Sequence, residues 1–149
     1  MANIEGSASE EIDAPLDEVW AAVADVASAP TWQDGLNAMH VLDTDAQDRP
    51  TLVETESDAK VKTVKAKIRF SYDPPTRLSW KQEEGDLKSL DGSWVLEDIG
   101  DGRTRATYAI DSDPGRKLGM LIRGPVEGKI RAMLVDGRPG ELKRHVERG

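Results

Sequence analysis

The chain has 149 residues, of which 38% are hydrophobic and none is cysteine, and its formal net charge is -8. This length allows one domain, over residues 1–149, to bury a core without disulfides or metals. The negative charge argues against nucleic acid and anionic membranes as partners, and no apolar run approaches the roughly 18 residues of a membrane-spanning helix. The amino end lacks a basic segment followed by an apolar one, so we expect no signal peptide and a cytoplasmic protein without integral membrane association.

The amino-terminal part of the chain predicts one strand and two short helices. Apolar residues lie among polar ones in a predicted strand over residues 3–12. Pro15 opens the first helix, because proline suits the first helical position and the acidic residues after it suit the positive end of the helix dipole. A second short helix is predicted over residues 25–36, broken around Pro30 and containing Trp32.

From Met39 onward the hydrophobic period changes to two, which is typical of strands with one buried face. Turn sequences such as Asp73-Pro74-Pro75-Thr76 and Gly100-Asp101-Gly102 separate the runs, so we expect hairpin connections. The clearest strand is predicted over residues 62–72. About six antiparallel strands are expected, over residues 39–43, 51–57, 62–72, from 78 to the turn at 84–86, 87–98 and 104–111.

The last stretch, residues 114–147, predicts one long helix. Pro139 removes a hydrogen bond within it, so we expect a kink or restart there, and several glycines weaken its first half. Its apolar residues recur at three- and four-residue spacing and form one stripe, as expected for a helix with a buried face. These residues are Leu118, Leu121, Ile122, Val126, Ile130, Met133, Leu134, Leu142 and Val146.

Together these elements predict an α+β fold, in which a strongly curved antiparallel sheet of about seven strands wraps around the long C-terminal helix. That helix is the only predicted element long enough to cover the apolar face of the sheet. A twisted sheet wrapped around one helix does not close tightly at both ends. We therefore expect an apolar gap between them, of the kind in which small-molecule sites form.

Five segments that span nearly the whole chain carry a further pattern: Ile12-Asp13-Ala14-Pro15-Leu16-Asp17-Glu18-Val19-Trp20, Asp73-Pro74-Pro75-Thr76-Arg77-Leu78-Ser79-Trp80, Gly92-Ser93-Trp94, Thr104-Arg105-Ala106-Thr107-Tyr108 and Gly140-Glu141-Leu142-Lys143. In this order they resemble the SRPBCC or START-like helix-grip superfamily, and within it the polyketide cyclase/dehydrase and lipid-transport branch. The resemblance implies the helix-grip fold and a cavity for a lipid- or polyketide-like ligand. It implies no single chemistry, because relatives include both carriers and aromatase/cyclases.

The large side chains on the inner faces of the sheet and helix are the predicted ligand-binding residues. The sequence leaves open which residues around Trp94 face inward, because either Trp94 or its neighbours Ser93 and Val95 could lie on the inner face of the sheet. Ordinary core packing is the competing interpretation for each of these residues. The set comprises Trp32, Ile68, Phe70, Trp80, Trp94, Tyr108, Leu118, Ile122 and Val126.

No nucleophile elbow, P-loop or dinucleotide-binding glycine pattern is present in the sequence. The candidates for a proton-transferring group are His40, Tyr72 and Tyr108. Two histidines far apart and no cysteine predict no metal site, and we expect no cofactor. Three functions stay open: non-enzymatic binding or transport of a small hydrophobic molecule, which is favoured, a cyclase, aromatase or dehydratase acting in the same cavity, and a protein-interaction module of the same fold.

Overall fold

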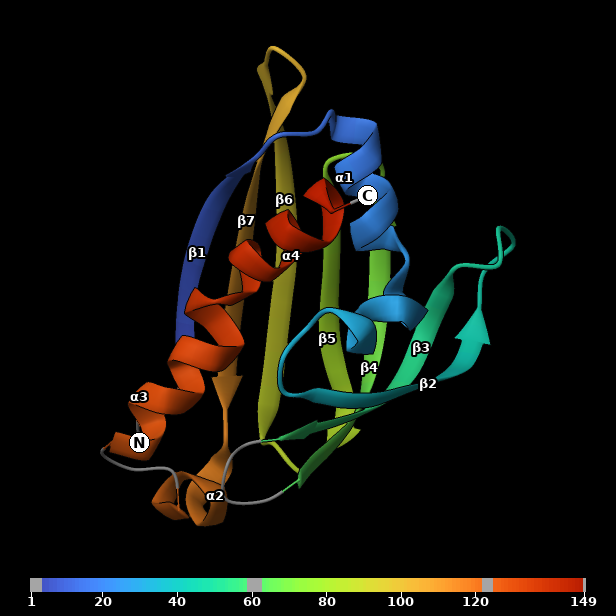
Figure 1. Ribbon diagram of the computed structural model, residues 1–149. Coiled ribbons are helices and arrows are strands. Elements are labelled where there is room, and N and C mark those ends of the chain that lie inside the picture. Colours follow the sequence, from blue (N-terminus) through green and yellow to red (C-terminus); the bar gives the residue numbers. More distant parts are fainter. Residues whose placement is uncertain (1–3, 59–62, 122–124, 149) are drawn as a thin grey trace.

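The computed structural model describes residues 4–58, 63–121 and 125–148. One curved sheet carries helices over one of its faces (Figure 1), which confirms the predicted α+β fold of about seven strands and a C-terminal helical segment. The strands are β1 (Ile4–Ile12), β2 (Leu36–Thr44), β3 (Pro50–Asp58), β4 (Thr63–Asp73), β5 (Arg77–Gly85), β6 (Ser89–Gly100) and β7 (Arg103–Asp113).

Among the described residues, helical segments occur at two places, after β1 and after β7. Two short helices follow β1, as predicted, and four segments follow β7. The first pair comprises α1 (Leu16–Ala24) and the 3₁₀-helix η1 (Val26–Thr31); the C-terminal group comprises α2 (Gly115–Leu121), α3 (Pro125–Arg131), the π-helix η2 (Ala132–Asp136) and α4 (Arg138–Glu147).

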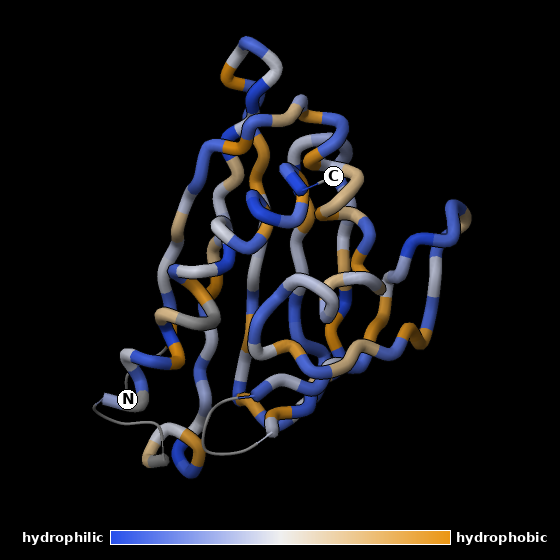
Figure 2. Tube along the Cα trace, viewed as in Figure 1, coloured by the Kyte–Doolittle hydropathy of each residue, from blue (hydrophilic) through white to orange (hydrophobic). Residues whose placement is uncertain are grey.

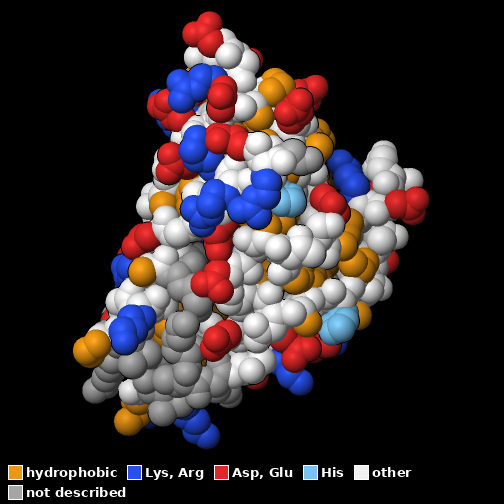
Figure 3. Space-filling view, viewed as in Figure 1, with side chains coloured by type: hydrophobic (Ala, Val, Ile, Leu, Met, Phe, Trp, Pro, Cys, Tyr) orange, Lys and Arg blue, Asp and Glu red, His pale blue; other side chains and the backbone are white. Residues whose placement is uncertain are grey.

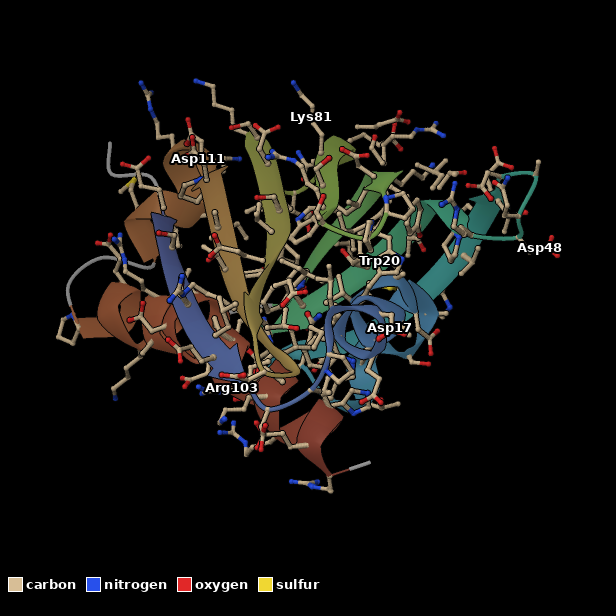
Figure 4. All side chains as sticks on the ribbon, turned by 90° about the horizontal axis from the view of Figure 1, so that it is seen from above. Asp17, Trp20, Asp48, Lys81, Arg103 and Asp111 are labelled. Carbon is tan, nitrogen blue, oxygen red and sulfur yellow. The ribbon has the colours of Figure 1, made fainter. Side chains whose placement is uncertain are left out.

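The strand order in the sheet is β1-β7-β6-β5-β4-β3-β2, with every neighbouring pair antiparallel. Five of these pairs join consecutive strands, whereas β1 pairs with β7, in a register that places Ile12 opposite Thr104. Seen from above, the sheet curves around the helices, and the labelled side chains of Lys81 and Asp111 point away from them (Figure 4). The inner face of the sheet is therefore the face that the helices cover.

Alternation along the strands separates the core from the outer face. In β4, residues 64, 66, 68 and 70 are buried, and hydrophobic and hydrophilic positions alternate along the chain trace (Figure 2). The open phase in β6 is also settled: Trp94 and Leu96 are each 2% exposed, whereas Val95 between them is 38% exposed. Trp94 is thus an inner-face residue, and Val95 lies on the outer face.

The C-terminal segment is not the single long helix that the apolar stripe predicts. The segment α3 begins at Pro125, whose missing N–H needs no partner at a helix start. A π-helical turn then precedes α4, and in it the Gly137 N–H donates to the Ala132 carbonyl at 2.9 Å. The predicted restart near Pro139 is present, because α4 begins at Arg138 and Pro139 lies in its first turn.

Candidate functional site

A cavity of about 170 Å³ lies between the inner face of the sheet and the C-terminal helices. Most of its wall is apolar, with contributions from β3 to β7, η1, β2 and the C-terminal segments. An apolar cavity of about 150 Å³ in another protein is large enough to bind benzene. This cavity therefore has room for a molecule of about the size of one or two rings. Its polar lining residues are Gln33, Thr55, Ser57, Asp58, Tyr108, Ser112 and Arg138.

Four aromatic side chains from four adjacent strands form a continuous row along the wall of the cavity. Phe70 of β4 lies 5.8 Å from Trp80 of β5, measured between ring centroids. Trp80 lies 5.7 Å from Tyr108 of β7, and Tyr108 lies 4.8 Å from Trp94 of β6. These tilted pairs have the spacing at which aromatic rings attract one another, so the row supports its own geometry.

A glycine in β6 makes this row possible. Trp80 belongs to β5 and Tyr108 to β7, so the indole must cross β6 to reach the phenol ring. Gly92 is the residue paired with Trp80. A Cβ atom at position 92 would lie 2.3 Å from the indole Nε1, closer than such atoms approach. The absence of a side chain at Gly92 therefore lets the indole lie across the backbone of β6.

A buried arginine in the cavity wall is a site residue that the sequence analysis missed. Arg138, the first residue of α4, is 3% exposed, and its Nη1 donates to the Asp34 carbonyl at 2.9 Å and to Glu141 Oε1 at 2.7 Å. Glu141 Oε2 in turn accepts the Asp34 backbone N–H at 2.7 Å. The guanidinium carbon lies 5.9 Å from the centroid of the Tyr108 ring. This network holds the loop after η1 against the start of α4. The i,i+3 spacing of Arg138 and Glu141 was the available signal, but the sequence predicted only a helix break around Pro139 and a family resemblance over Gly140-Glu141-Leu142-Lys143.

Six of the nine predicted ligand-binding residues line the cavity. Trp32 does not: the centroid of its ring lies 6.3 Å from that of Trp94, and the ring stacks on His145 at 5.4 Å. Ile122 and the side chain of Val126 lie outside the described part of the structure. The six that line the cavity are Ile68, Phe70, Trp80, Trp94, Tyr108 and Leu118. Their role in ligand binding stays a prediction.

The family model described as "Polyketide cyclase / dehydrase and lipid transport" matches residues 12–137. The chain belongs to this family. The resemblance of the five sequence segments to the START-like superfamily and its polyketide cyclase branch is thereby confirmed. No curated protein matches the chain.

Solved structures with the same fold cover almost the whole of this polyketide cyclase family member. A START superfamily protein from Mycobacterium smegmatis is 15% identical, with a TM-score of 0.82 over 99% of each chain. A protein from Thermus thermophilus is 20% identical, with a TM-score of 0.81 over 97% of each chain. The Zhui aromatase/cyclase from Streptomyces sp. R1128 is 19% identical, with a TM-score of 0.74 over 97% of this chain and 93% of its own. At these identities the likeness shows the fold alone.

The structure places the three candidate proton-transferring groups of this family member differently. His40 lies outside the cavity, with 60% of its side chain exposed and its Nε2 3.6 Å from Glu56 Oε2. The Tyr72 hydroxyl also lies outside the cavity lining and donates to the Pro50 carbonyl at 2.5 Å, and burial raises its pKa to about 12. Tyr108 lines the cavity, and burial raises its pKa despite the opposing effect of the nearby guanidinium. Tyr108 is thus protonated at neutral pH.

Charged side chains of both signs cover the outside of this family member. On the face seen in Figure 3, acidic and basic side chains are interspersed, and basic ones gather over α4. Within residues 4–58, 63–121 and 125–148, no group of three or more acidic or histidine side chains is arranged to hold a metal ion. In the same ranges, no helix is both long and apolar enough to cross a membrane.

Proposed function

We propose that the chain binds or transports a small hydrophobic molecule in the cavity between the sheet and the C-terminal helices. The observation that carries this proposal is the row of four aromatic rings along a largely apolar internal cavity. Burial of a ligand there would contribute about 25 cal/mol for each Å² of apolar surface removed from water, before the entropic cost of binding. The lipid-transport part of the family description supports this proposal.

The size of the cavity favours a compact ligand over a long acyl chain. Pockets for drug-sized ligands have volumes of about 300–1,000 Å³, whereas this cavity measures about 170 Å³. Flat rings can also stack on the indoles of Trp80 and Trp94 without a large loss of conformational entropy. We therefore propose a ligand built around one or two rings.

Native mass spectrometry of gently purified protein, with a denatured control, tests for a resident ligand. The expected result is a reproducible adduct that is lost on denaturation, because a ligand held only by apolar contacts leaves when the fold opens. The mass of the adduct would also report the class of molecule. An apo mass in every preparation would count against a tightly bound cargo and would leave a transiently occupied site.

A cavity-filling substitution tests the location of the site. Ala66 lines the cavity, whereas Ala109 is on the opposite face of the same sheet. Ala66→Leu should weaken the binding of the hydrocarbon probe α-methylstyrene, measured by NMR titration, because the leucine side chain occupies part of the cavity. Ala109→Leu is the matched control and should leave binding unchanged. Equal binding by both variants would exclude this cavity as the site.

A second candidate function is cyclase, aromatase or dehydratase chemistry in the same cavity. The observation in its favour is the Tyr108 hydroxyl, which is buried in the cavity wall beside the guanidinium of Arg138. A protonated phenol next to a cation can donate a proton or stabilise a developing enolate. Conversion of a poly-β-ketone substrate that is lost in Tyr108→Phe, with binding retained, would support an enzyme. No turnover by the unmodified chain would favour the carrier.

A further inference from the structure

Arg138, which lines the cavity, has a buried hydrogen-bond donor without an acceptor in the described part of the chain. Both hydrogen bonds that Arg138 makes to Asp34 and Glu141 use its Nη1. The Nε of Arg138 is buried and has no hydrogen-bond partner among the described residues. A buried N–H group without an acceptor is costly, and more so when it belongs to a charged group. Such groups are rare in folded proteins, and each requires an explanation.

A second donor lies beside it. The guanidinium carbon of Arg138 lies 5.9 Å from the centroid of the Tyr108 ring, and this cation opposes the effect of burial on the pKa of the phenol. A guanidinium has donors and no acceptor, so the hydroxyl proton of Tyr108 cannot bond to it. Both residues line the cavity. One wall of an otherwise apolar cavity thus presents two neighbouring donor groups.

The position of Arg138 is fixed before any ligand arrives. Its ion pair with Glu141 is almost fully buried, with 4% and 11% of the two side chains exposed. The same carboxylate is held by the Asp34 backbone N–H. A donor that is already immobilised loses little entropy when a ligand binds, so its hydrogen bond contributes more fully to affinity. The arrangement is suited to recognition as well as to joining the loop to α4.

The charges around the pair decide what kind of acceptor it suits. Glu141 balances the positive charge of Arg138, and the other charged side chain among the described lining residues is the acidic Asp58. A ligand carboxylate would add a negative charge that no described lining residue compensates, in a poorly solvated place. A neutral oxygen acceptor adds no charge. The local charge balance therefore favours an uncharged acceptor over an anion.

We propose that Arg138 and Tyr108 bind an uncharged carbonyl-type oxygen at one end of a small ring-containing ligand. The ligand class is then a cyclic or aromatic ketone, aldehyde or quinone, rather than a carboxylic acid or a plain hydrocarbon. The aromatic row holds the ring and the donor pair orients the oxygen. This inference rests on the proposed binding function, and it assigns a polar subsite within the same cavity.

Three probes of nearly equal shape test the subsite: acetophenone, α-methylstyrene, in which a methylene group replaces the oxygen, and benzoate. We expect acetophenone to bind about tenfold more tightly than α-methylstyrene in NMR titrations of the labelled protein, since a hydrogen bond from a charged donor contributes about that factor. Benzoate should bind more weakly than acetophenone. The comparison with α-methylstyrene removes differences in ring stacking and apolar burial.

Two variants assign the preference to the donor pair. In Arg138→Met combined with Glu141→Gln, no buried charge is left unpaired, and the tenfold preference should fall to the smaller preference that the Tyr108 hydroxyl alone supports. In Glu141→Gln alone the arginine charge is uncompensated, so benzoate binding should strengthen while the preference for acetophenone persists. A purely structural ion pair would not produce that gain. Arg105→Met, a substitution on the outer face of the sheet, is the control and should change neither ratio.

The outcomes separate this inference from the proposed function. If α-methylstyrene and acetophenone bind the unmodified chain equally well, the cavity binds ligands but the oxygen subsite is wrong. If neither probe binds, the proposed function fails for ring-sized ligands and the subsite fails with it. If the double variant does not fold, the response of Glu141→Gln to benzoate decides: no gain in affinity would overturn the assignment.

Discussion

Substitution of Gly92 by alanine should displace the indole at the centre of the aromatic row. A Cβ atom at this position would lie 2.3 Å from Nε1 and Cε2 of Trp80 and 2.5 Å from its Cζ2. These are rigid ring atoms that cannot yield separately, so the whole indole has to move away from β6. Because the indole touches Tyr108 across this strand, the displacement breaks a contact in the cavity wall.

The expected cost follows from the packing conflict. Overpacking a well-filled site with one extra carbon costs about 1–3 kcal/mol. In a domain of this length, each kcal/mol lowers the melting temperature by about 2–4 °C. With a conflict near the middle of that range, about 2 kcal/mol, Gly92→Ala should melt about 4–8 °C below the unmodified chain. Calorimetry or circular dichroism would measure the shift, and binding of α-methylstyrene should weaken in parallel.

A second strand glycine provides the control for this prediction. A Cβ atom at Gly6 of β1 would lie 3.6 Å from Val135 Cγ1, an ordinary contact, so Gly6→Ala should be neutral or slightly stabilising. In a Trp80→Leu background, the smaller side chain should remove the conflict, and Gly92→Ala should then cost little. Strict additivity of the two substitutions, or equal melting of Gly92→Ala and Gly6→Ala, would refute the packing argument.

Two further predictions concern the tyrosines and a buried threonine. The chain has two tyrosines, and burial is the main reason that the pKa of each is raised, that of Tyr72 to about 12. Tyrosinate absorbance of the native protein should therefore be below half of its full value at about pH 10, the usual tyrosine pKa, and rise mainly above it. The contribution of the neutral phenols to stability is fully present below the unfolded pKa and is lost as the pH rises through the raised native pKa, because the native state disfavours the charged form. Titration of half the tyrosine near about pH 10 would contradict this. Thr104→Val should cost about 1–3 kcal/mol in urea denaturation, because its buried hydroxyl donates to the Ala14 carbonyl at 2.9 Å, whereas Thr107→Val, at an exposed hydrogen bond, should cost far less.

Much of the sheet could be predicted from local patterns in the sequence. Alternation in residues 62–72 predicted which side chains of β4 face inward, and that prediction placed Ile68 and Phe70 on the inner face. Turn residues predicted the hairpins, and hairpins make consecutive strands neighbours in the sheet. Periodicity failed in the C-terminal segment because the apolar spacing continues across Pro125 and through the π turn. An apolar stripe indicates which side of a segment is buried. It does not indicate whether the segment forms one continuous helix.

The polar part of the site could not be predicted from local patterns. From the sequence, an arginine at a helix start is expected to be exposed to solvent. The burial of Arg138 depends instead on a hydrogen bond to the backbone carbonyl of Asp34, which is far away in the sequence. Trp32 is the converse case: this large aromatic residue was predicted to bind a ligand, whereas its ring packs against Trp94 and is not part of the cavity lining. Both cases depend on the tertiary contact between the loop after η1 and α4. Hydrophobic periodicity within one segment cannot predict a contact between two distant segments.

The pairing of β1 with β7 has a consequence for how this protein is made. A chain that leaves the ribosome amino end first carries β1 without a partner until β7, which begins at Arg103, has also emerged. Closing a loop of that length opposes early pairing, and such long-range contacts slow folding. The cavity is delayed further, because its wall extends from Ile4 to Arg138. A nascent chain therefore exposes the inner faces of its hairpins until the segment that contains Arg138 has been synthesised, and only then is the cavity wall complete.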